Sequence, residues 1–149
     1  MGNPLILPSE RAAVVGVINP QSGAAGTYST AWIAMKDFQT IQAILLAGAL
    51  GASGTVDAKL QQAKDGAGTG AKDIAGKAIT QLTQAGTDSN KQAVINLRDD
   101  ELDVNNDFTH ARLLVTNAVA ASLIAAVVLG HDARTNPATD LASVDEIVA

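Results

Sequence analysis

The sequence predicts an all-β domain, a sandwich or a barrel, and three observations carry this expectation. Short apolar and β-branched runs recur at intervals of roughly 10 to 15 residues, which is typical of sandwiches and barrels. Clusters of Gly, Asn, Asp and Ser that favour turns separate these runs, as in Ala85–Asn90. The 149 residues are 47% apolar, enough for one domain with a core, yet only 3% are aromatic.

The clearest predicted strand covers residues 55–63, where apolar and polar residues alternate. Val56, Ala58 and Leu60 point to one side of the strand and the polar residues between them to the other. This strand belongs to a β-sandwich body that we expect over residues 30–132. Further strands of this body are expected over 92–98, 109–116 and 122–129.

Two extended segments are expected to flank the body, an N-terminal arm over residues 1–29 and a C-terminal tail over 133–149. Each proline of the arm removes a backbone donor and pushes the preceding residue toward extended geometry. These prolines are Pro4, Pro8 and Pro20. Within the arm, Ala12–Ile18 is apolar and β-branched enough to add one strand to a sheet.

A helical body is the alternative that the sequence leaves open. Between Lys72 and Gln84, Ile74, Ala75, Ala78, Ile79 and Leu82 have helical spacing. The segments 40–50 and 118–128 are rich in Ala and Leu, which favour helix over strand.

Composition argues against several classes of function. The net charge of −5 disfavours binding to nucleic acid or to anionic membranes, because both need clustered Lys and Arg. The chain has no cysteine, which excludes disulfides, thiolate metal sites and cysteine nucleophiles. The N-terminal residues do not resemble a secretion signal. The apolar stretch 118–130 is too short for a membrane-spanning helix, which needs roughly 20 residues.

Two segments resemble ligand-binding loops without matching them. In Gly66–Lys72, Ala71 separates the last glycine from the lysine, so the loop fits neither a P-loop nor a dinucleotide fingerprint. In Asp99–Asp107, the first three positions of a calcium loop are matched from Asp103 onward. Phe108 and Leu114 then stand where that loop needs glycine and glutamate. A flexible hairpin and a solvated connection are the expected structures.

No arrangement of catalytic residues is evident. A zinc site made from His110, His131 and one aspartate is conceivable, but nothing in the sequence places the two histidines together. No Ser elbow motif is present. We therefore expect no catalytic, cofactor or metal residues, no cofactor and no enzymatic activity.

The run from Tyr28 to Arg134 resembles small virion structural proteins of tailed bacteriophages and related prophages. The residues that carry the resemblance are Ser29–Phe38, Leu60–Asp73, Lys91–Arg98, Glu101–Val104, Phe108–Arg112 and Gly130–Arg134. The resemblance implies a β-sandwich or jelly-roll component of the particle. Such components serve as capsid cement or decoration subunits, or as head-completion and tail proteins.

From this resemblance we expect a capsid cement or decoration subunit, in a virion assembled in the cytoplasm of a bacterial host. Its partners would be the major capsid protein and copies of itself in a homo-oligomer, for which a trimer is one closed form. The expected interface residues are Leu5, Ile6, Leu7 and Pro8 of the arm, with Trp32 as an anchor.

Two alternative functions stay open at this point. The first is a head–tail connector or tail structural subunit. The second is a calcium- or carbohydrate-binding β-sandwich module, which the acidic segment 99–107 motivates.

Overall fold

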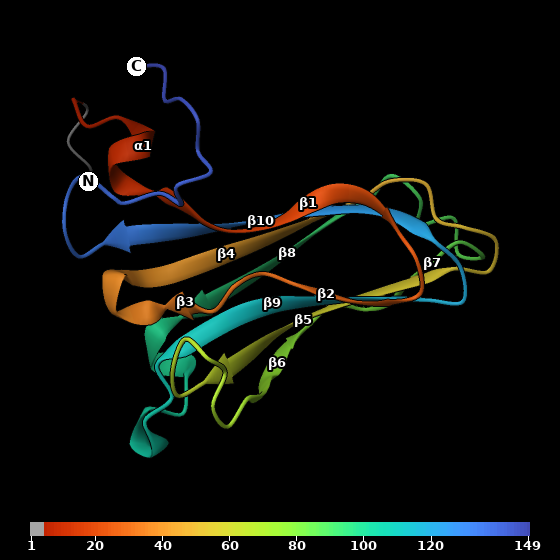
Figure 1. Ribbon diagram of the computed structural model, residues 1–149, viewed down its shortest axis with the longest axis horizontal. Coiled ribbons are helices and arrows are strands. Elements are labelled where there is room, and N and C mark those ends of the chain that lie inside the picture. Colours follow the sequence, from red (N-terminus) through yellow and green to blue (C-terminus); the bar gives the residue numbers. More distant parts are fainter. Residues whose placement is uncertain (1–4) are drawn as a thin grey trace.

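The computed structural model describes residues 5–149, which form two antiparallel β-sheets packed face to face (Figure 1). Sheet A contains four strands in the order β1 (Ala13–Gly23), β10 (Ser122–Ala133), β4 (Phe38–Ala47) and β8 (Gln92–Arg98). Sheet B has the order β2 (Gly26–Ser29), β9 (His110–Ala118), β5 (Thr55–Ala63) and β6 (Lys72–Ala78). Two short strands complete it, β3 (Ile33–Ala34) beside β9 and β7 (Leu82–Thr83) beside β5.

The chain passes back and forth between the two sheets, and this gives the fold its topology. Strand β1 lies in sheet A, β2 and β3 in sheet B, β4 in A, β5 to β7 in B, β8 in A, β9 in B and β10 in A. Except for β5 with β6 and β7, neighbouring strands within a sheet are therefore distant in sequence, as in Greek-key connections. The predicted all-β class is confirmed, as a jelly-roll sandwich.

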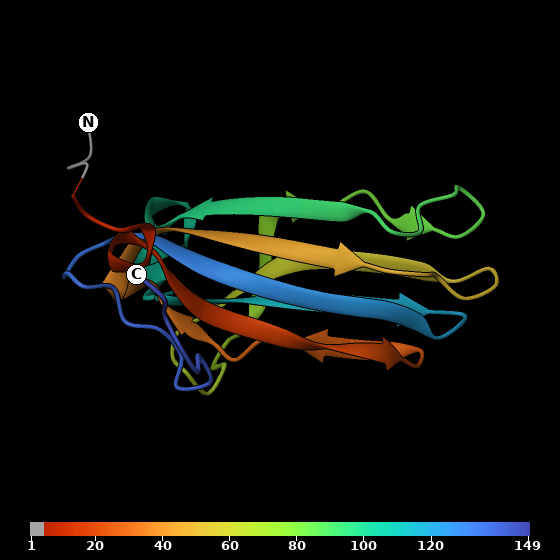
Figure 2. The same cartoon turned by 90° about the horizontal axis from the view of Figure 1, so that it is seen from above.

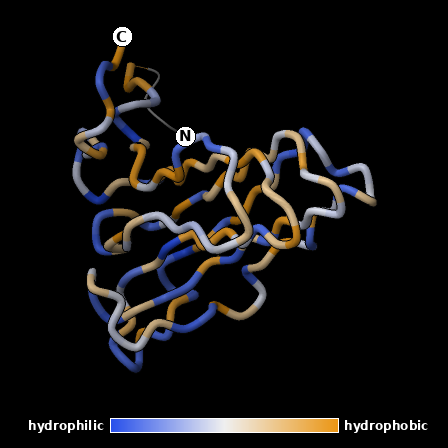
Figure 3. Tube along the Cα trace, turned by 45° about the vertical axis from the view of Figure 1, so that its right-hand side comes forward, coloured by the Kyte–Doolittle hydropathy of each residue, from blue (hydrophilic) through white to orange (hydrophobic). Residues whose placement is uncertain are grey.

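The core lies between the sheets and is built from the inward-facing residues of both. Alternation along β5 buries Val56, Ala58 and Leu60, as the sequence predicts. Small and branched aliphatic side chains fill most of the space, and in Figure 3 the apolar (orange) stretches run mainly along the strands. Buried members from sheet A include Ile18, Ile41, Ala43, Leu45, Ile95, Leu97, Ile124, Ala126 and Val128.

The helical alternative is wrong. Residues 72–84 contain β6 and β7, and the two Ala- and Leu-rich segments contain β4 and the first part of β10. The sequences of 40–50 and 118–128 are compatible with helix because β4 and β10 carry apolar side chains on both faces. A strand that is apolar on both faces shows no alternation and reads as a continuous apolar run.

The structure corrects the expected N-terminal arm over most of its length. Residues 13–29 are strands β1 and β2, and β1 pairs with β10 from Ala13 to Gly23. Pro20 is accommodated because β1 is an edge strand with a register shift between Ile18 and Gln21. Before β1, a single helical turn, α1 (Pro8–Arg11), begins with Pro8. Pro4 and the rest of 1–4 lie outside the described residues.

The C-terminal segment lies alongside α1 and the start of β1 and is held there by hydrogen bonds. After β10 ends at Ala133, residues 134–149 contain no helix or strand. The Ala138 N–H donates to the Glu10 carbonyl (3.0 Å) and the Leu141 N–H to the Val14 carbonyl (2.9 Å). Asp140 Oδ1 accepts the Val14 N–H at 2.7 Å. The expected tail is therefore docked along the outer edge of β1.

Three 3-10 turns complete the described structure. The turn η1 (Met35–Asp37) leads into β4 and buries Met35. The acidic segment after β8 forms η2 (Asp99–Glu101) and η3 (Val104–Asn106). Among residues 5–149, no helix has the length and apolar content that crossing a membrane requires.

Gly130 tests the packing of the core. A Cβ added at Gly130 would lie 2.6 Å from the ring of Phe38, which is buried. We expect Gly130→Ala to lower the free energy of unfolding by about 1–3 kcal/mol through overpacking. Gly66→Ala is the matched control, because its added Cβ would meet nothing closer than His110 Nε2 at 3.9 Å. Denaturant unfolding of both variants makes the measurement, and equal stabilities would contradict the packing described.

Candidate docking surface

The two outer faces of the sandwich differ in chemistry. The outer face of sheet B carries polar and charged side chains that bind one another. Lys59 Nζ lies 2.8 Å from Asp73 Oδ2, and Gln61 Nε2 donates to Asp73 Oδ1 at 2.9 Å. Arg112 donates to Gln61 Oε1 through Nε and Nη2, at 3.1 and 2.9 Å. This network is typical of a face that remains in water.

The outer face of sheet A is apolar at its centre. Strand pairing aligns Val17 with Val127, Val127 with Ile44 and Ile44 with Val94, so that a row of branched apolar residues crosses all four strands. Directly opposite residues in a sheet share a face, and the buried neighbours of these residues point to the core, so the row points outward.

Further apolar residues extend this row on the same face. Leu46 of β4 lies opposite Ala125 of β10. Leu123 and Leu129 are on the same face of β10, one before Ala125 and the other after Val127. Three of the side chains are substantially exposed, Leu46 at 44%, Leu123 at 47% and Val94 at 52%. We define the apolar patch as Val17, Ile44, Leu46, Val94, Leu123, Ala125, Val127 and Leu129.

The patch contains no charged residue, and it borders a shallow depression at one end. That depression, of about 460 Å³, is lined by Leu46, Gly48, Leu123 and the segment 20–22 of β1. Contiguous apolar patches with a polar border often mark a contact surface. The patch is therefore the candidate docking surface.

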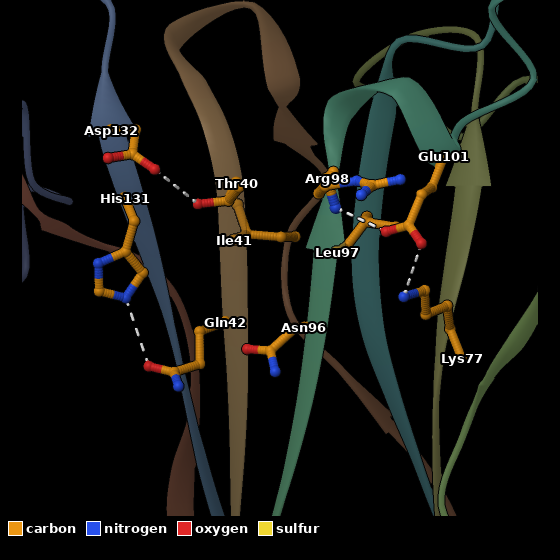
Figure 4. A pocket seen from close by; sticks show the side chains of 10 residues that line it. All are labelled: Thr40, Ile41, Gln42, Lys77, Asn96, Leu97, Arg98, Glu101, His131 and Asp132. Atoms are coloured by element: carbon orange, nitrogen blue, oxygen red, sulfur yellow. Dashed lines mark hydrogen bonds and ion pairs between the residues drawn. The ribbon is translucent and has the colours of Figure 1, made fainter.

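A polar groove of about 560 Å³ borders the patch at the end where β4 begins (Figure 4). His131 Nε2 lies 3.3 Å from Gln42 Oε1, and Thr40 Oγ1 donates to Asp132 Oδ2 at 3.4 Å. Asn96 projects from β8 beside Gln42. An apolar centre with a polar border is the usual anatomy of a protein interface.

Glu101 closes the outer side of this groove. Its carboxylate accepts the Arg98 N–H at 2.8 Å and lies 3.0 Å from Lys77 Nζ. The Arg98 N–H and then the Lys77 ammonium hold the pKa of Glu101 below its usual value. Glu101 is therefore a carboxylate at neutral pH that fixes the end of β8.

The predicted arm residues directly precede and begin α1, at the end of the molecule where the C-terminus lies (Figure 1). Leu5 is 86% and Leu7 42% exposed, while Ile6 is half-buried and Pro8 is exposed at the start of α1. The Leu7 N–H donates to Glu10 Oε2 at 2.7 Å. The role of these residues in an interface stays a prediction.

Trp32 is half-buried and contacts sheet B rather than the apolar patch. The Arg112 guanidinium lies 4.5 Å from the centre of its ring. Gly68 packs so closely that an added Cβ would lie 2.7 Å from Trp32 Nε1. The role of Trp32 as an interface anchor is not tested by these contacts and stays a prediction.

The Gly-rich loop is folded around an aspartate. Asp65 Oδ1 accepts the N–H groups of Ala67 and Thr69, at 2.9 and 3.1 Å. Hydrogen bonding to the Thr69 side chain, and then to the Thr69 and Ala67 N–H groups, lowers the pKa of Asp65. Gly68 and Gly70 adopt positive φ, which permits the tight turn. A carboxylate in the place where amides would cradle a phosphate does not suit anion binding.

The candidate metal ligands are separated. His110 lies on β9 in sheet B and His131 on β10 in sheet A. Asp103 lies 2.5 Å from Lys72 Nζ and accepts from Asn106, and both contacts lower its pKa. Across residues 5–149, no three His, Asp or Glu side chains are grouped so as to hold a metal ion.

Sequence reasoning missed the apolar patch. A signal for it exists in the segments 41–47 and 123–129, where apolar residues occupy both the odd and the even positions. The same pattern also favours a helix. Strand order was also needed, because β1, β4, β8 and β10 become neighbours only in the folded sheet.

The chain matches no protein-family model and no curated protein sequence. Solved structures with a similar arrangement of chain include one from the cryo-EM structure of broad bean stain virus. It has 11% identity and a TM-score of 0.46, over 99% of each chain. A chain of the cowpea mosaic virus top component has 13% identity and a TM-score of 0.42, covering 87% of this chain and 89% of that one. A xylan-binding domain of CBM 22 has 16% identity and a TM-score of 0.41, covering 89% and 92%.

Acid titration follows from the paired carboxylates. The pKa of Asp73 is lowered, first by its hydrogen bond with Lys59, and that of Asp88 first by the Thr83 N–H. Groups with a depressed pKa in the folded state stabilise it above their unfolded pKa of about 4 and lose that contribution as the pH falls further. We expect a melting temperature that is level from pH 8 to about pH 5 and falls below about pH 4. A melting temperature that rises on acidification from pH 5 to pH 3 would contradict this.

Proposed function

We propose that this chain is a non-enzymatic structural subunit of a tailed-phage virion, a cement or decoration protein that binds capsid subunits on the head. The apolar patch is the observation that carries the proposal. It gives the molecule one face with an uncharged, apolar centre and one charged face, which suits a subunit that lies on a larger surface.

The patch suits binding to a shell because its centre is apolar and its border is polar. Burial of apolar area contributes about 25 cal/mol per Å², and part of this offsets the loss of translational freedom on binding. A single contact through this patch is expected to be weak. Many copies on a symmetric shell, each held by several neighbours, bind far more tightly together.

The arm residues supply a second contact in this proposal. Leu5, Ile6 and Leu7 lie at the end of the molecule where the C-terminal segment also ends, apart from the apolar patch. A neighbouring capsid subunit, or a neighbouring copy of this chain, would receive them while the patch faces the shell. The proposed location is the virion.

A head–tail connector or tail subunit is the nearest alternative, since it would use the same face with far fewer copies. The carbohydrate-binding alternative has one specific observation in its favour. The polar groove presents the amides of Gln42 and Asn96 and the imidazole of His131, which are groups that bind sugar hydroxyls.

Copy number in purified particles tests the proposal. Quantitative mass spectrometry would measure this chain against the major capsid protein. We expect a ratio near one to one, or one to a few, because a cement subunit covers the whole shell. A few copies per particle would move the role to the connector or tail, and absence from particles would overturn the virion proposal.

Leu46→Lys tests the face that binds. Leu46 lies in the patch on an interior strand and is 44% exposed, so we expect this change to leave the fold intact. Affinity for particles should fall at least about tenfold, because a charge would be buried without a partner.

Thr116→Lys is the matched control. It places the same charge on β9 in the outer face of sheet B, opposite Asp57. Binding of both variants to particles that lack the chain is measured by co-sedimentation. Equal affinity of the two variants would show that the patch is not the binding face.

A further inference from the structure

The two sheets of the sandwich have four edges, and three of them are protected against pairing with another strand. On β1, the register shifts twice and Pro20 interrupts the row of donors. The C-terminal segment also occupies this edge through Asp140 and Leu141, which bind the backbone of Val14. Bulges, prolines and covering segments are devices that keep an edge from recruiting another strand.

The edges of sheet B are protected by interruption and by charge. One edge consists of β2 and β3, which are short and separated by residues 30–32. The other consists of β6 and β7, where the pairing of β6 with β5 shifts register between Lys59 and Gln61. Gly76 of β6 has positive φ, and Lys72, Asp73 and Lys77 place charges along it.

The edge of β8 has none of these devices from Gln92 to Asn96, and only its Arg98 end is covered, by the Glu101 carboxylate and the Lys77 ammonium that pairs with it. Its seven residues, Gln92–Arg98, pair with β4 without a register shift and contain no proline, and Arg98 at the end is the only charged one. In Figure 2 this strand is the outermost of its sheet, with no strand of that sheet beyond it.

The backbone groups that face outward from β8 can be assigned from its two ends. The Lys91 carbonyl accepts the Ala47 N–H, so Lys91, Ala93, Ile95 and Leu97 direct their backbone groups toward β4. The Arg98 N–H instead binds the Glu101 carboxylate on the other side. Gln92, Val94 and Asn96 therefore point their N–H and C=O groups outward, and no residue within 5–149 hydrogen-bonds those of Val94 or Asn96.

We infer that β8 pairs edge to edge with β8 of a second copy of this chain, antiparallel, about a two-fold axis at Val94. Val94 then lies opposite Val94 of the second copy, and Gln92 lies opposite Asn96. The two four-stranded sheets become one continuous sheet. The apolar row Val17, Val127, Ile44 and Val94 continues directly into the same row of the second copy.

A second copy related by a two-fold axis fits this edge better than a ring does. A ring joins two different surfaces of the same molecule, which would require a second unprotected edge. Among the described edges, only that of β8 is regular and uncharged over most of its length, so pairing of this edge with itself needs no second open edge. Arg98 of one copy would lie about 27 Å from Arg98 of the other, which removes like-charge repulsion from the joint.

This inference deepens the proposed function by naming a partner for one edge, and it rests on that proposal only in assuming that the chain acts by assembly. Association is measured on the free chain without particles. Failure of the edge pairing therefore leaves the particle-binding face to be judged separately through Leu46→Lys.

Single-cysteine variants test the pairing, because the chain has no cysteine of its own. In the paired state the two Val94 Cα atoms would lie about 5.5 Å apart. A short bifunctional thiol cross-linker should therefore convert Val94→Cys to covalent dimer. Leu46→Cys is the matched control, with similar exposure (44% against 52%) on the same face. Its two Cα atoms would be about 20 Å apart in the edge-paired dimer, too far for the linker.

Sedimentation velocity of the unmodified chain and of Val94→Pro accompanies the cross-linking. Proline at 94 removes an outward N–H and spares the bonds to β4. The dissociation constant of the dimer should therefore rise at least tenfold. Dimer from Val94→Cys, with little from Leu46→Cys, supports the inference. Equal or faster cross-linking of Leu46→Cys would indicate face-to-face pairing and overturn it. A chain that stays monomeric at high concentration would overturn it as well.

Discussion

A two-layer sandwich can bury only one face of each sheet, and the rest of the structure depends on how this chain meets that constraint. Sheet B meets it in the usual way, with aliphatic residues inward and a bonded network of Lys59, Asp73 and Gln61 outward. Sheet A does not, because β4 and β10 are apolar on both faces. The inward face completes the core, and the outward face leaves an exposed apolar surface of the kind that usually marks a contact site.

The parts of the fold that could be predicted from sequence are those where the two faces of a strand differ. The strand over 55–63 was predicted correctly because Leu60 and its apolar neighbours alternate with polar residues. The segment 40–50 was ambiguous because Ile44 and Leu46 add apolar residues to the outward positions. Pro20 suggested an arm, but an edge strand with a shifted register can hold a proline.

The docking surface itself could not be predicted, because it is a property of strand order. Val17, Ile44, Val94 and Val127 come from four distant segments and meet only when β10 and β4 are placed between β1 and β8. The predicted interface residues Leu5 to Pro8 rest on local sequence instead, and their role stays a prediction. Leu5, Leu7 and Pro8 are exposed, and Ile6 is half-buried. Their contacts depend on a partner whose surface the sequence does not encode. His110 and His131 lie in different sheets because the chain crosses from one sheet to the other between the consecutive strands β9 and β10.

The central claim is that the outer face of sheet A becomes buried in the assembled state while that of sheet B stays in water. Hydroxyl-radical footprinting of the chain, free and bound to particles, tests it most directly. The account predicts that labelling of Leu46, Leu123 and Leu129 falls sharply on binding, whereas labelling of Leu114 on the outer face of sheet B is unchanged. Undiminished labelling of the apolar patch in the bound state, or protection of Leu114 instead, would contradict the account.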